Sequence, residues 1–328
     1  MKRCGIIGAG AWGTAISTII RSEKIYIWTR NKNTSNLINK KRISKNLKGI
    51  KIPKNIVATS DLEDLRGCEY FFIATPTQQT ASIIKSLKKY KIKKNFILCS
   101  KGIEIKSGRF LSEIIKDIFP KARIAVLSGP SFADEVAKKM PTAVLLSSKS
   151  KKFFDEVSKL INNTYFRVYY SNDILGCQLG GAIKNIYAIG AGIVKGMGLG
   201  ENASSAFISR SFAEILRLGK VIGANEKTFF GLSGLGDLVL TCNSNKSRNT
   251  NFGRILTKNK NIKIFNIVKT QKTVTEGYYT SKALFYYSKK HKLEMPILKS
   301  IYRILYQKAV IEKEIKLVLN RSIKKEFY

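Results

Sequence analysis

The pattern G-x-G-x-x-G, formed by Gly8, Gly10 and Gly13, stands close to the start of the chain in the stretch "GIIGAGAWGTAIS". The apolar run before it predicts a strand, and the residues after it predict a helix. Three glycines in this context permit a tight turn, close approach of a pyrophosphate to the backbone, and close packing of the helix on the strand. A plain turn is the alternative, but the strand–turn–helix context favours a dinucleotide site.

The rest of the first half alternates short β-branched or aromatic runs with amphipathic segments such as 78–88 and 152–161. This alternation predicts a doubly wound, largely parallel α/β sheet of the Rossmann type. The predicted strands begin at Cys4, Ile25, Ile56, Glu69, Phe96, Arg123, Thr142 and Phe166.

From about residue 174 the strand pattern stops. The runs that follow are helical, at 174–194, 204–219, 252–258, 280–290 and 296–306. The chain of 328 residues is long enough for two domains. We therefore expect a dinucleotide-binding domain over 1–173 and an all-α substrate-binding domain over 174–328.

The run 174–194 is long enough to span a bilayer and carries one charged residue, Lys184. Its five glycines, together with Gln178 and Asn185, make it a poor helix for contact with lipid. Small residues suit a central helix that its neighbours approach closely. We therefore expect this run to lie inside a globular domain.

The chain carries 59 Lys and Arg against 22 Asp and Glu, a formal net charge of +37. Such an excess is typical of proteins that bind nucleic acids or membrane surfaces. Here the basic residues are spread along the chain, and the densest run, "KKYKIKK" at 88–94, belongs to no known nucleic-acid motif. We interpret the charge as a solvated surface that also attracts anionic metabolites, with nucleic-acid binding as the alternative.

Five cysteines lie far apart without a CxxC pair, which predicts neither a disulfide framework nor a zinc site. We expect buried, reduced thiols and no metal. The glycine pattern begins too early to leave room for a signal peptide before it, so we expect a cytoplasmic protein.

The end of the second predicted strand indicates which cofactor the chain prefers. An NAD-specific domain places an acid there to bind the ribose hydroxyls. This chain has Trp28, Thr29 and Arg30 instead. Because an arginine can pair with the 2′-phosphate, NADP is favoured over NAD, with an exposed surface arginine as the alternative.

A proton-transfer group is also expected. The only histidine, His291, lies among lysines in "SKKHKLEMP" and is expected at the surface. Lys184 is the stronger candidate, because burial on an apolar helix lowers the pKa of an ammonium toward neutrality and so suits a general acid or base. A structural lysine that reaches the surface is the alternative.

Seven blocks, in order and at characteristic intervals, extend this interpretation to the whole chain. They are "GAGAWGTA", "SKGIE", "SGPSFADEVA", "QLGGAIKNIYAIGAGI", "GLSGLGDLVLTC", "SRNTNFG" and "TVTEGY". Together they closely resemble the bacterial NAD(P)-dependent glycerol-3-phosphate dehydrogenases. The resemblance implies reversible reduction of dihydroxyacetone phosphate to sn-glycerol 3-phosphate for phospholipid synthesis, by a cytoplasmic and usually dimeric enzyme.

The same resemblance assigns roles to individual residues. It makes Lys184 the catalytic lysine and Asp237 a carboxylate that positions and balances it. The implied substrate contacts are Lys101, Gly129, Ser131, Lys184, Asp237, Ser247, Arg248 and Asn249. The implied cofactor contacts, beside the glycines, are Ala11, Trp12, Lys101, Ala133, Arg248, Val274 and Glu276. An arginine fork at a helix start is well suited to a phosphate dianion.

Two connections depart from the family pattern: "RSEK" at 21–24 replaces a common "NGH", and Lys48 stands where proline is common. They bear on loop shape and cofactor preference rather than on the reaction. The nearest enzymatic alternative is another lysine-using 3-hydroxyacid dehydrogenase, whose carboxylate substrate would not need the phosphate site predicted at "SRN".

Overall fold

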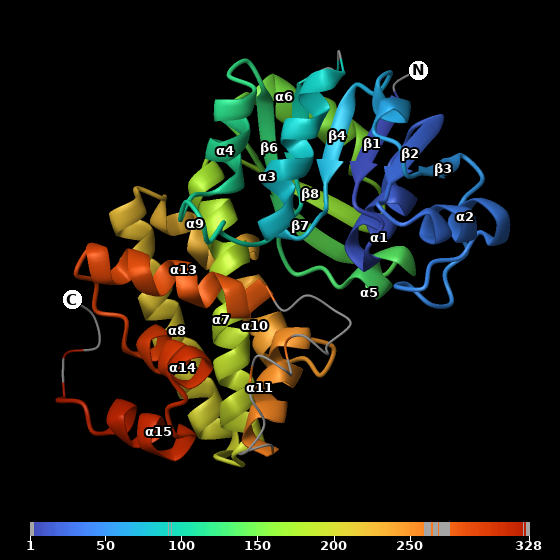
Figure 1. Cartoon of the computed structure of the whole chain (residues 1–328). Helices are drawn as coiled ribbons and strands as arrows, with labels where there is room; N and C mark the ends of the chain where they lie inside the picture. The colour runs from blue at the N-terminus through green and yellow to red at the C-terminus, as the bar shows by residue number, and fades with distance from the viewer. Residues whose placement is uncertain are drawn as a thin grey trace.

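The computed structural model describes residues 3–90, 92, 94–258, 264, 268, 276–323 and 325. Figure 1 shows a sheet covered by helices, built from the first half of the chain, beside a bundle of helices built from the second half. Helix α7 (Ile174–Gly196) extends from the sheet through the middle of the bundle. The first turns of α7 are one of the places where the two halves are in contact.

Within the described residues the strands form one eight-stranded sheet in the order β3-β2-β1-β4-β5-β6-β7-β8. Neighbouring strands are parallel except β6 and β7, which are antiparallel. The predicted doubly wound, largely parallel sheet is confirmed. The strands are β1 (Arg3–Ile7), β2 (Lys24–Trp28), β3 (Ile56–Thr59), β4 (Tyr70–Ile73), β5 (Asn95–Leu98), β6 (Arg123–Ser128), β7 (Thr142–Ser148) and β8 (Phe166–Ser171).

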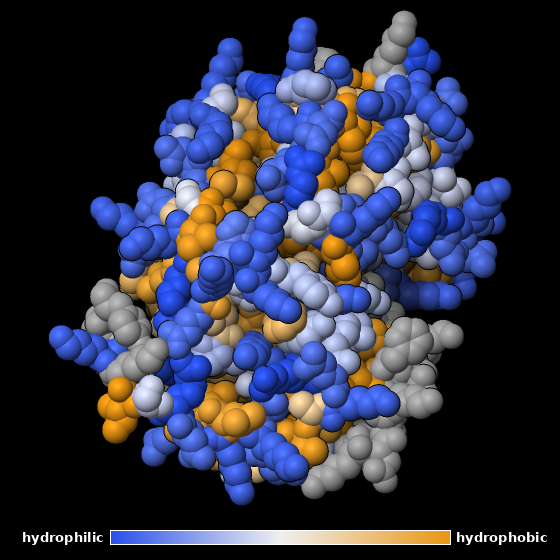
Figure 2. Space-filling model, turned by 60° about the vertical axis from the view of Figure 1, so that its left-hand side comes forward, coloured by the Kyte–Doolittle hydropathy of each residue, from blue (hydrophilic) through white to orange (hydrophobic). Residues whose placement is uncertain are grey.

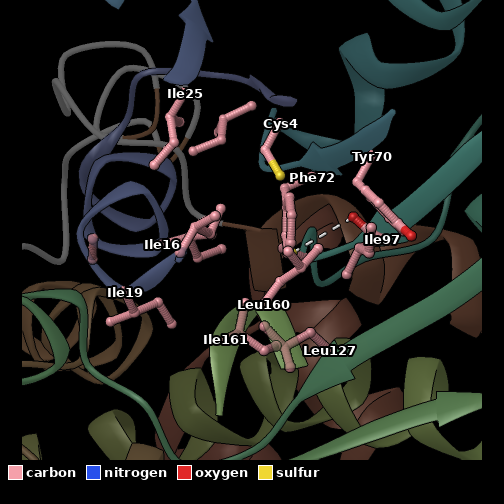
Figure 3. Close-up of a cluster of buried hydrophobic side chains, with 14 of the residues drawn as sticks. Cys4, Ile16, Ile19, Ile25, Tyr70, Phe72, Ile97, Leu127, Leu160 and Ile161 are labelled. Carbon is pink, nitrogen blue, oxygen red and sulfur yellow. Dashed lines mark hydrogen bonds between the residues drawn. The ribbon is translucent and has the colours of Figure 1, made fainter. Parts of the chain in front are cut away.

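Both faces of the sheet are buried, because successive side chains of a strand point to opposite faces. Ile6 and Phe72 belong to one hydrophobic cluster, whereas their neighbours Ile7 and Phe71 belong to another. Figure 3 shows the first cluster, where Ile16 lies on the same side of the sheet as Phe72. The helices of this half are α1 (Ala11–Ile19), α2 (Lys32–Lys41), α3 (Thr77–Ser86), α4 (Leu111–Ile118), α5 (Ala133–Ala137) and α6 (Lys151–Ile161), with short 3₁₀ turns at Glu63–Leu65 and Leu87–Lys89.

The second half is helical in all its described elements, as predicted. Besides α7 it contains α8 (Gly200–Ile222), α9 (Glu226–Phe230), the π-helical turn Leu232–Gly236, α10 (Asp237–Asn243), α11 (Arg248–Lys258), α13 (Glu276–Lys290), α14 (Pro296–Gln307) and α15 (Ile311–Leu319). The division of the chain at 173/174 stays a prediction; in the structure β8 ends at Ser171 and α7 begins at Ile174.

Helix α7 is buried along nearly its whole length, because its small residues let neighbours approach. A Cβ on Gly192 would lie 2.0 Å from the Thr250 carbonyl oxygen, and one on Gly253 would lie 2.0 Å from that of Ile189. The backbones of α7 and α11 are therefore in direct contact. No helix in the described part of the chain is long and apolar enough to cross a membrane, which agrees with the expectation for this run.

The five cysteines all lie in the described part of the chain and all are buried, as expected. Hydrophilic side chains are distributed over most of the face shown in Figure 2, with hydrophobic residues in smaller groups between them. This agrees with the dispersed placement of the basic residues in the sequence.

Candidate active site

A cleft of about 640 Å³ lies where the carboxyl ends of the sheet strands face α7. Loops that follow β1, β2, β4, β5 and β6 form one wall, and residues of α7, α10, α11 and α13 form the other. Open α/β sheets bind ligands at this edge. The cleft brings together most of the residues predicted from the sequence: Gly8, Gly10, Ala11, Trp12, Arg30, Lys101, Ser131, Ala133, Lys184, Ser247, Arg248, Asn249 and Glu276.

The glycine loop between β1 and α1 has the predicted shape. Gly8 adopts φ +118°, and a Cβ on Gly13 would lie 1.9 Å from the Gly8 carbonyl oxygen, so both positions exclude a side chain. A Cβ on Gly10 would meet no atom of the described residues within 4 Å. Gly10 therefore leaves open space at the amino end of α1, where backbone N–H groups attract phosphate.

These observations test whether a dinucleotide fits the cleft. The space beside Gly10 would admit a pyrophosphate, and the Trp12 indole lines the cleft while donating a hydrogen bond to the Cys99 carbonyl oxygen at 3.2 Å. The loop from Gly8 to Gly13 fits the dinucleotide predicted from the sequence.

Lys184 and Lys101 converge on the carboxylate of Asp237. The Lys184 ammonium donates to Asp237 Oδ1 at 2.5 Å, and the Lys101 ammonium donates to Oδ2 at 2.7 Å. The Asp237 side chain is fully buried. Two ammonium groups thus share one carboxylate, which leaves a net positive charge in a site shielded from water.

Thr241 holds Lys184 from a second side. Its hydroxyl donates to the Asp237 carbonyl oxygen at 2.6 Å and accepts a hydrogen bond from the Lys184 ammonium at 2.9 Å. An ammonium has three N–H groups, so one remains after the bonds to Asp237 and Thr241. Burial lowers the pKa of Lys184 to about 8, although the Asp237 carboxylate opposes that effect.

The segment "SRN" begins helix α11 at the other end of the cleft. The Ser247 hydroxyl accepts from the Thr250 amide at 3.2 Å and so caps this helix. Asn249 links Asn185 on α7 to the Gly277 amide on α13, at 3.0 and 3.1 Å. Among the described residues the Arg248 side chain has no hydrogen-bond or ion-pair partner, so its guanidinium is available to an anion in the cleft.

The block "SGPSFA" follows β6. The Gly129 carbonyl oxygen accepts from the Lys101 ammonium at 3.0 Å and from the Ser131 hydroxyl at 2.9 Å. Gly129 has φ +150° and holds the Lys101 ammonium through its carbonyl oxygen without lining the cleft. Ser131 and Ala133 line the cleft.

Arg30 lies at the end of β2, exposed, on the wall of the cleft next to the glycine loop. Its guanidinium donates to the Gln79 side-chain oxygen at 2.7 Å, and no carboxylate lies at the end of β2 in the segment Trp28–Asn31. Gln79 is a neutral partner, so Arg30 keeps its full charge beside the cleft.

Glu276 begins α13 and faces the sheet wall. Its Oε1 accepts from the Thr77 amide at 3.1 Å, whereas the buried Oε2 has no hydrogen-bond partner among the described residues. Burial raises the pKa of Glu276 to about 7. The predicted cofactor contact Val274 lies outside the described residues.

Thr241, Asn185 and Gln79 were not predicted as site residues. Thr241 follows Asp237 by four residues, so one helix face presents both, and this spacing was the available signal. His291 is exposed and stacks on Tyr287, with 4.3 Å between ring centroids, as expected of a surface residue.

The chain resembles known proteins over nearly its whole length. Residues 3–154 match the family model described as the N-terminus of NAD-dependent glycerol-3-phosphate dehydrogenase, and residues 173–316 match that of its C-terminus. A glycerol-3-phosphate dehydrogenase [NAD(P)+] of Thermotoga sp. (strain RQ2) is 40% identical over 98% of both chains.

A second curated relative of the same description, from Francisella tularensis subsp. novicida, is 40% identical over 99% of both chains. The crystal structure of glycerol-3-phosphate dehydrogenase from Coxiella burnetii superposes with a TM-score of 0.93 at 32% identity, over 98% of this chain and 99% of that one. The chain is therefore an oxidoreductase that belongs to the NAD-dependent glycerol-3-phosphate dehydrogenase family.

Proposed function

We propose that this chain catalyses the reversible reduction of dihydroxyacetone phosphate to sn-glycerol 3-phosphate, with Lys184 as the general acid. The proposal rests on the position of the Lys184 ammonium in the lining of the cleft. Two of its three N–H groups bond to Asp237 and Thr241, so the third is left for a substrate. When bound, NAD(P)H supplies the hydride that reduces the C2 carbonyl. The proton then passes from the Lys184 ammonium to the carbonyl oxygen.

The charges around Lys184 suit this step. The oxygen of the substrate gains negative charge as its carbon is reduced, and the net positive charge of Lys184, Lys101 and Asp237 stabilises that charge. A pKa of about 8 leaves Lys184 mostly protonated at pH 7, yet able to take back the proton in the oxidation direction. Lys101 carries a second ammonium toward the same part of the cleft.

Substrate selection follows from Arg248 and the start of α11. We assign the phosphate of the substrate to the Arg248 guanidinium together with the Ser247 and Asn249 end of the helix, which lies on the wall of the cleft that also carries Lys184. A 3-hydroxyacid substrate carries a carboxylate in place of the phosphate and would not need a site for a phosphate dianion. The phosphate site is therefore the feature that separates the two enzymatic alternatives.

We propose NADPH as the preferred cofactor, because Arg30 is charged, exposed and next to the cleft while no acid stands at the end of β2. The other predicted contacts with cofactor and substrate remain part of this proposal: Gly8, Gly10, Ala11, Trp12, Gly13, Lys101, Gly129, Ser131, Ala133, Val274 and Glu276.

The physiological setting rests on the resemblance alone. We expect the product to serve glycerophospholipid synthesis, in the cytoplasm, and the enzyme to be a homodimer. Size-exclusion chromatography with light scattering tests the last of these expectations.

One assay tests the proposed reaction. The absorbance of NADPH or NADH is followed after addition of dihydroxyacetone phosphate, of unphosphorylated dihydroxyacetone, or of a 3-oxoacid. We expect oxidation of the cofactor with the phosphorylated ketone above all. Turnover with the 3-oxoacid alone would favour the other enzyme class. Binding of duplex DNA that weakens steeply with salt, with no turnover of any ketone, would favour the nucleic-acid alternative.

A further inference from the structure

A second hollow, of about 230 Å³, lies in the helical half and shares no lining residue with the active-site cleft. We call it the α8–α14 pocket. Its walls come from α8, the start of α14, the end of α15 and the segment that follows α15. The lining residues are Arg210, Ala213, Glu214, Arg217, Glu294, Pro296, Ile297, Val318, Arg321, Ser322 and Lys325.

The lining contains four basic side chains and two carboxyl groups. Glu294 forms an ion pair with Arg321 and accepts, through its backbone carbonyl oxygen, a hydrogen bond from Arg217 Nε at 3.1 Å. Over the described residues the two Nη atoms of Arg217 have no hydrogen-bond partner. A planar pair of donors is thus left open at the pocket.

The hydrogen bonds of Glu214 go to groups other than the arginines of the pocket. Its carboxyl group is fully buried and accepts from the Tyr187 hydroxyl at 2.8 Å and from the backbone amides of Ile297 and Leu298 at 2.7 and 3.1 Å. Glu214 thereby caps the amino end of α14. Burial raises its pKa to about 7, so near neutral pH it carries less than a full negative charge. Among the lining residues that the structure describes, basic side chains therefore outnumber carboxyl groups.

One wall of the pocket is apolar, formed by Ala213, Pro296, Ile297 and Val318. A ligand that satisfies both walls has an anionic group with several acceptor oxygens and a short apolar body. We propose that the α8–α14 pocket binds a small phosphate monoester with an apolar substituent, its phosphate on the open Arg217 guanidinium beside Arg321 and its apolar part against Ile297 and Val318.

This site is independent of the proposed reaction. Val318, Arg321, Ser322 and Lys325 lie beyond residues 173–316, the part of the chain that the C-terminal family model matches. The pocket is therefore assembled partly from a segment outside the matched region, and its ligand need not be the substrate.

Isothermal titration calorimetry of the full chain with n-butyl phosphate tests the proposal. We expect binding to the wild type, weaker binding of inorganic phosphate, and none of n-butanol. Arg217→Gln combined with Arg321→Gln should weaken n-butyl phosphate binding by about 10-fold or more, since charge-assisted hydrogen bonds are lost. Val318→Asp, which places a carboxylate at the apolar wall, should do the same if the double variant does not fold.

Two further variants distinguish this pocket from the active-site cleft and from general attraction by the positive surface. Arg248→Ala removes the anion site proposed in the cleft, so the binding that persists in this variant is assigned to the α8–α14 pocket. Arg66→Gln, an exposed position on the sheet half, removes one positive charge as a matched control. The proposal is overturned if the wild type does not bind, if Arg248→Ala abolishes the binding, or if Arg66→Gln weakens it as much as the pocket variants do.

Discussion

Asp237→Asn is the perturbation that most directly tests how the site sets the protonation of Lys184. Asparagine has the same shape as aspartate but removes the charge that Lys184 and Lys101 share at 2.5 and 2.7 Å. Burial and the repulsion from Lys101 both lower the pKa of Lys184, and Asp237 opposes them. In the variant both lowering effects remain and the opposing one is gone.

The size of the effect follows from the separation of the charges. At about 4 Å and an effective dielectric constant of about 20, one unit charge contributes about 4 kcal/mol. Because each pKa unit corresponds to about 1.36 kcal/mol, the protonated fraction of Lys184 at pH 7 should fall by a factor on the order of 100. When the pKa of Lys184 is lowered, the ammonium loses its proton at a lower pH, so the acid form is lost earlier as the pH rises.

The assay is kcat against pH in both directions. In the wild type, reduction needs protonated Lys184 and should decline as pH rises through about 8. In Asp237→Asn that decline should move well below pH 7, so reduction at pH 7 should fall on the order of 100-fold. Oxidation, which needs neutral Lys184, should lose much less at the same pH.

Asp155→Asn is the matched control, because Asp155 is an exposed carboxylate paired with Lys151 on α6 of the sheet half. It should change neither profile, and melting followed by circular dichroism should show that both variants are folded. If Asp237→Asn lowers both directions equally with no movement of the pH midpoint, Asp237 acts through the shape of the site and the electrostatic reasoning is refuted.

Three other substitutions test separate parts of the cleft. Lys184→Met should lower turnover by about 10²–10⁴-fold while cofactor binding, measured by fluorescence titration, stays nearly unchanged; more than half of the wild-type turnover would exclude the lysine as general acid. Arg248→Ala should raise KM for dihydroxyacetone phosphate by a factor that reflects roughly 1.5–3 kcal/mol, and unchanged discrimination against unphosphorylated dihydroxyacetone would place the phosphate elsewhere. Arg30→Asp should reverse a preference for NADPH in kcat/KM at fixed ionic strength, and an equal ratio in both proteins would mean that Arg30 contacts only Gln79.

The sheet was predictable because most of its central strands, such as β4 and β5, are buried on both faces. Runs such as 70–73 are continuous and apolar, and glycine or polar residues bound them, so each strand is visible in the sequence by itself. The short helices were not predictable in this way. Helices α9 and α10 contain 5 and 7 residues, too few for a 3.6-residue period to show.

The first turn of α11 was expected at "SRN" from the resemblance, but the apolar period alone does not show it. The helix begins at Arg248, whereas the apolar pattern that predicts it begins at Phe252. Its opening residues face the cleft and its polar contacts rather than the hydrophobic core, so they carry no apolar period. The residues that line the cleft are polar, so the turn of helix that positions them shows no apolar period in the sequence.

Lys184 and Asp237 differ in how well the sequence alone predicts them as site residues. Lys184 was visible because it is the one charge in a long apolar run, and burial of a charge is costly without a partner. Its partner lies 53 residues away on a separate helix, so no local pattern pairs the two, and only the resemblance pointed to Asp237. Thr241 is uncharged, and the sequence around it gives no sign of a site. Its hydroxyl comes within hydrogen-bond distance of Lys184 only because α10 packs against α7.

The protein carries two kinds of positive charge, which differ in their exposure to water. The net charge of +37 belongs to the chain as a whole, and salt screens exposed charges over about 8 Å at physiological ionic strength. Lys184 and Lys101 differ because the carboxylate between them is fully buried and their ammonium groups are largely shielded. Their field acts within the cleft at a low effective dielectric constant, where it favours a developing oxyanion far more than surface lysines can. In the proposed reaction, the overall charge would attract anionic substrates, and the two ammonium groups that share the Asp237 carboxylate would stabilise the oxyanion within the cleft.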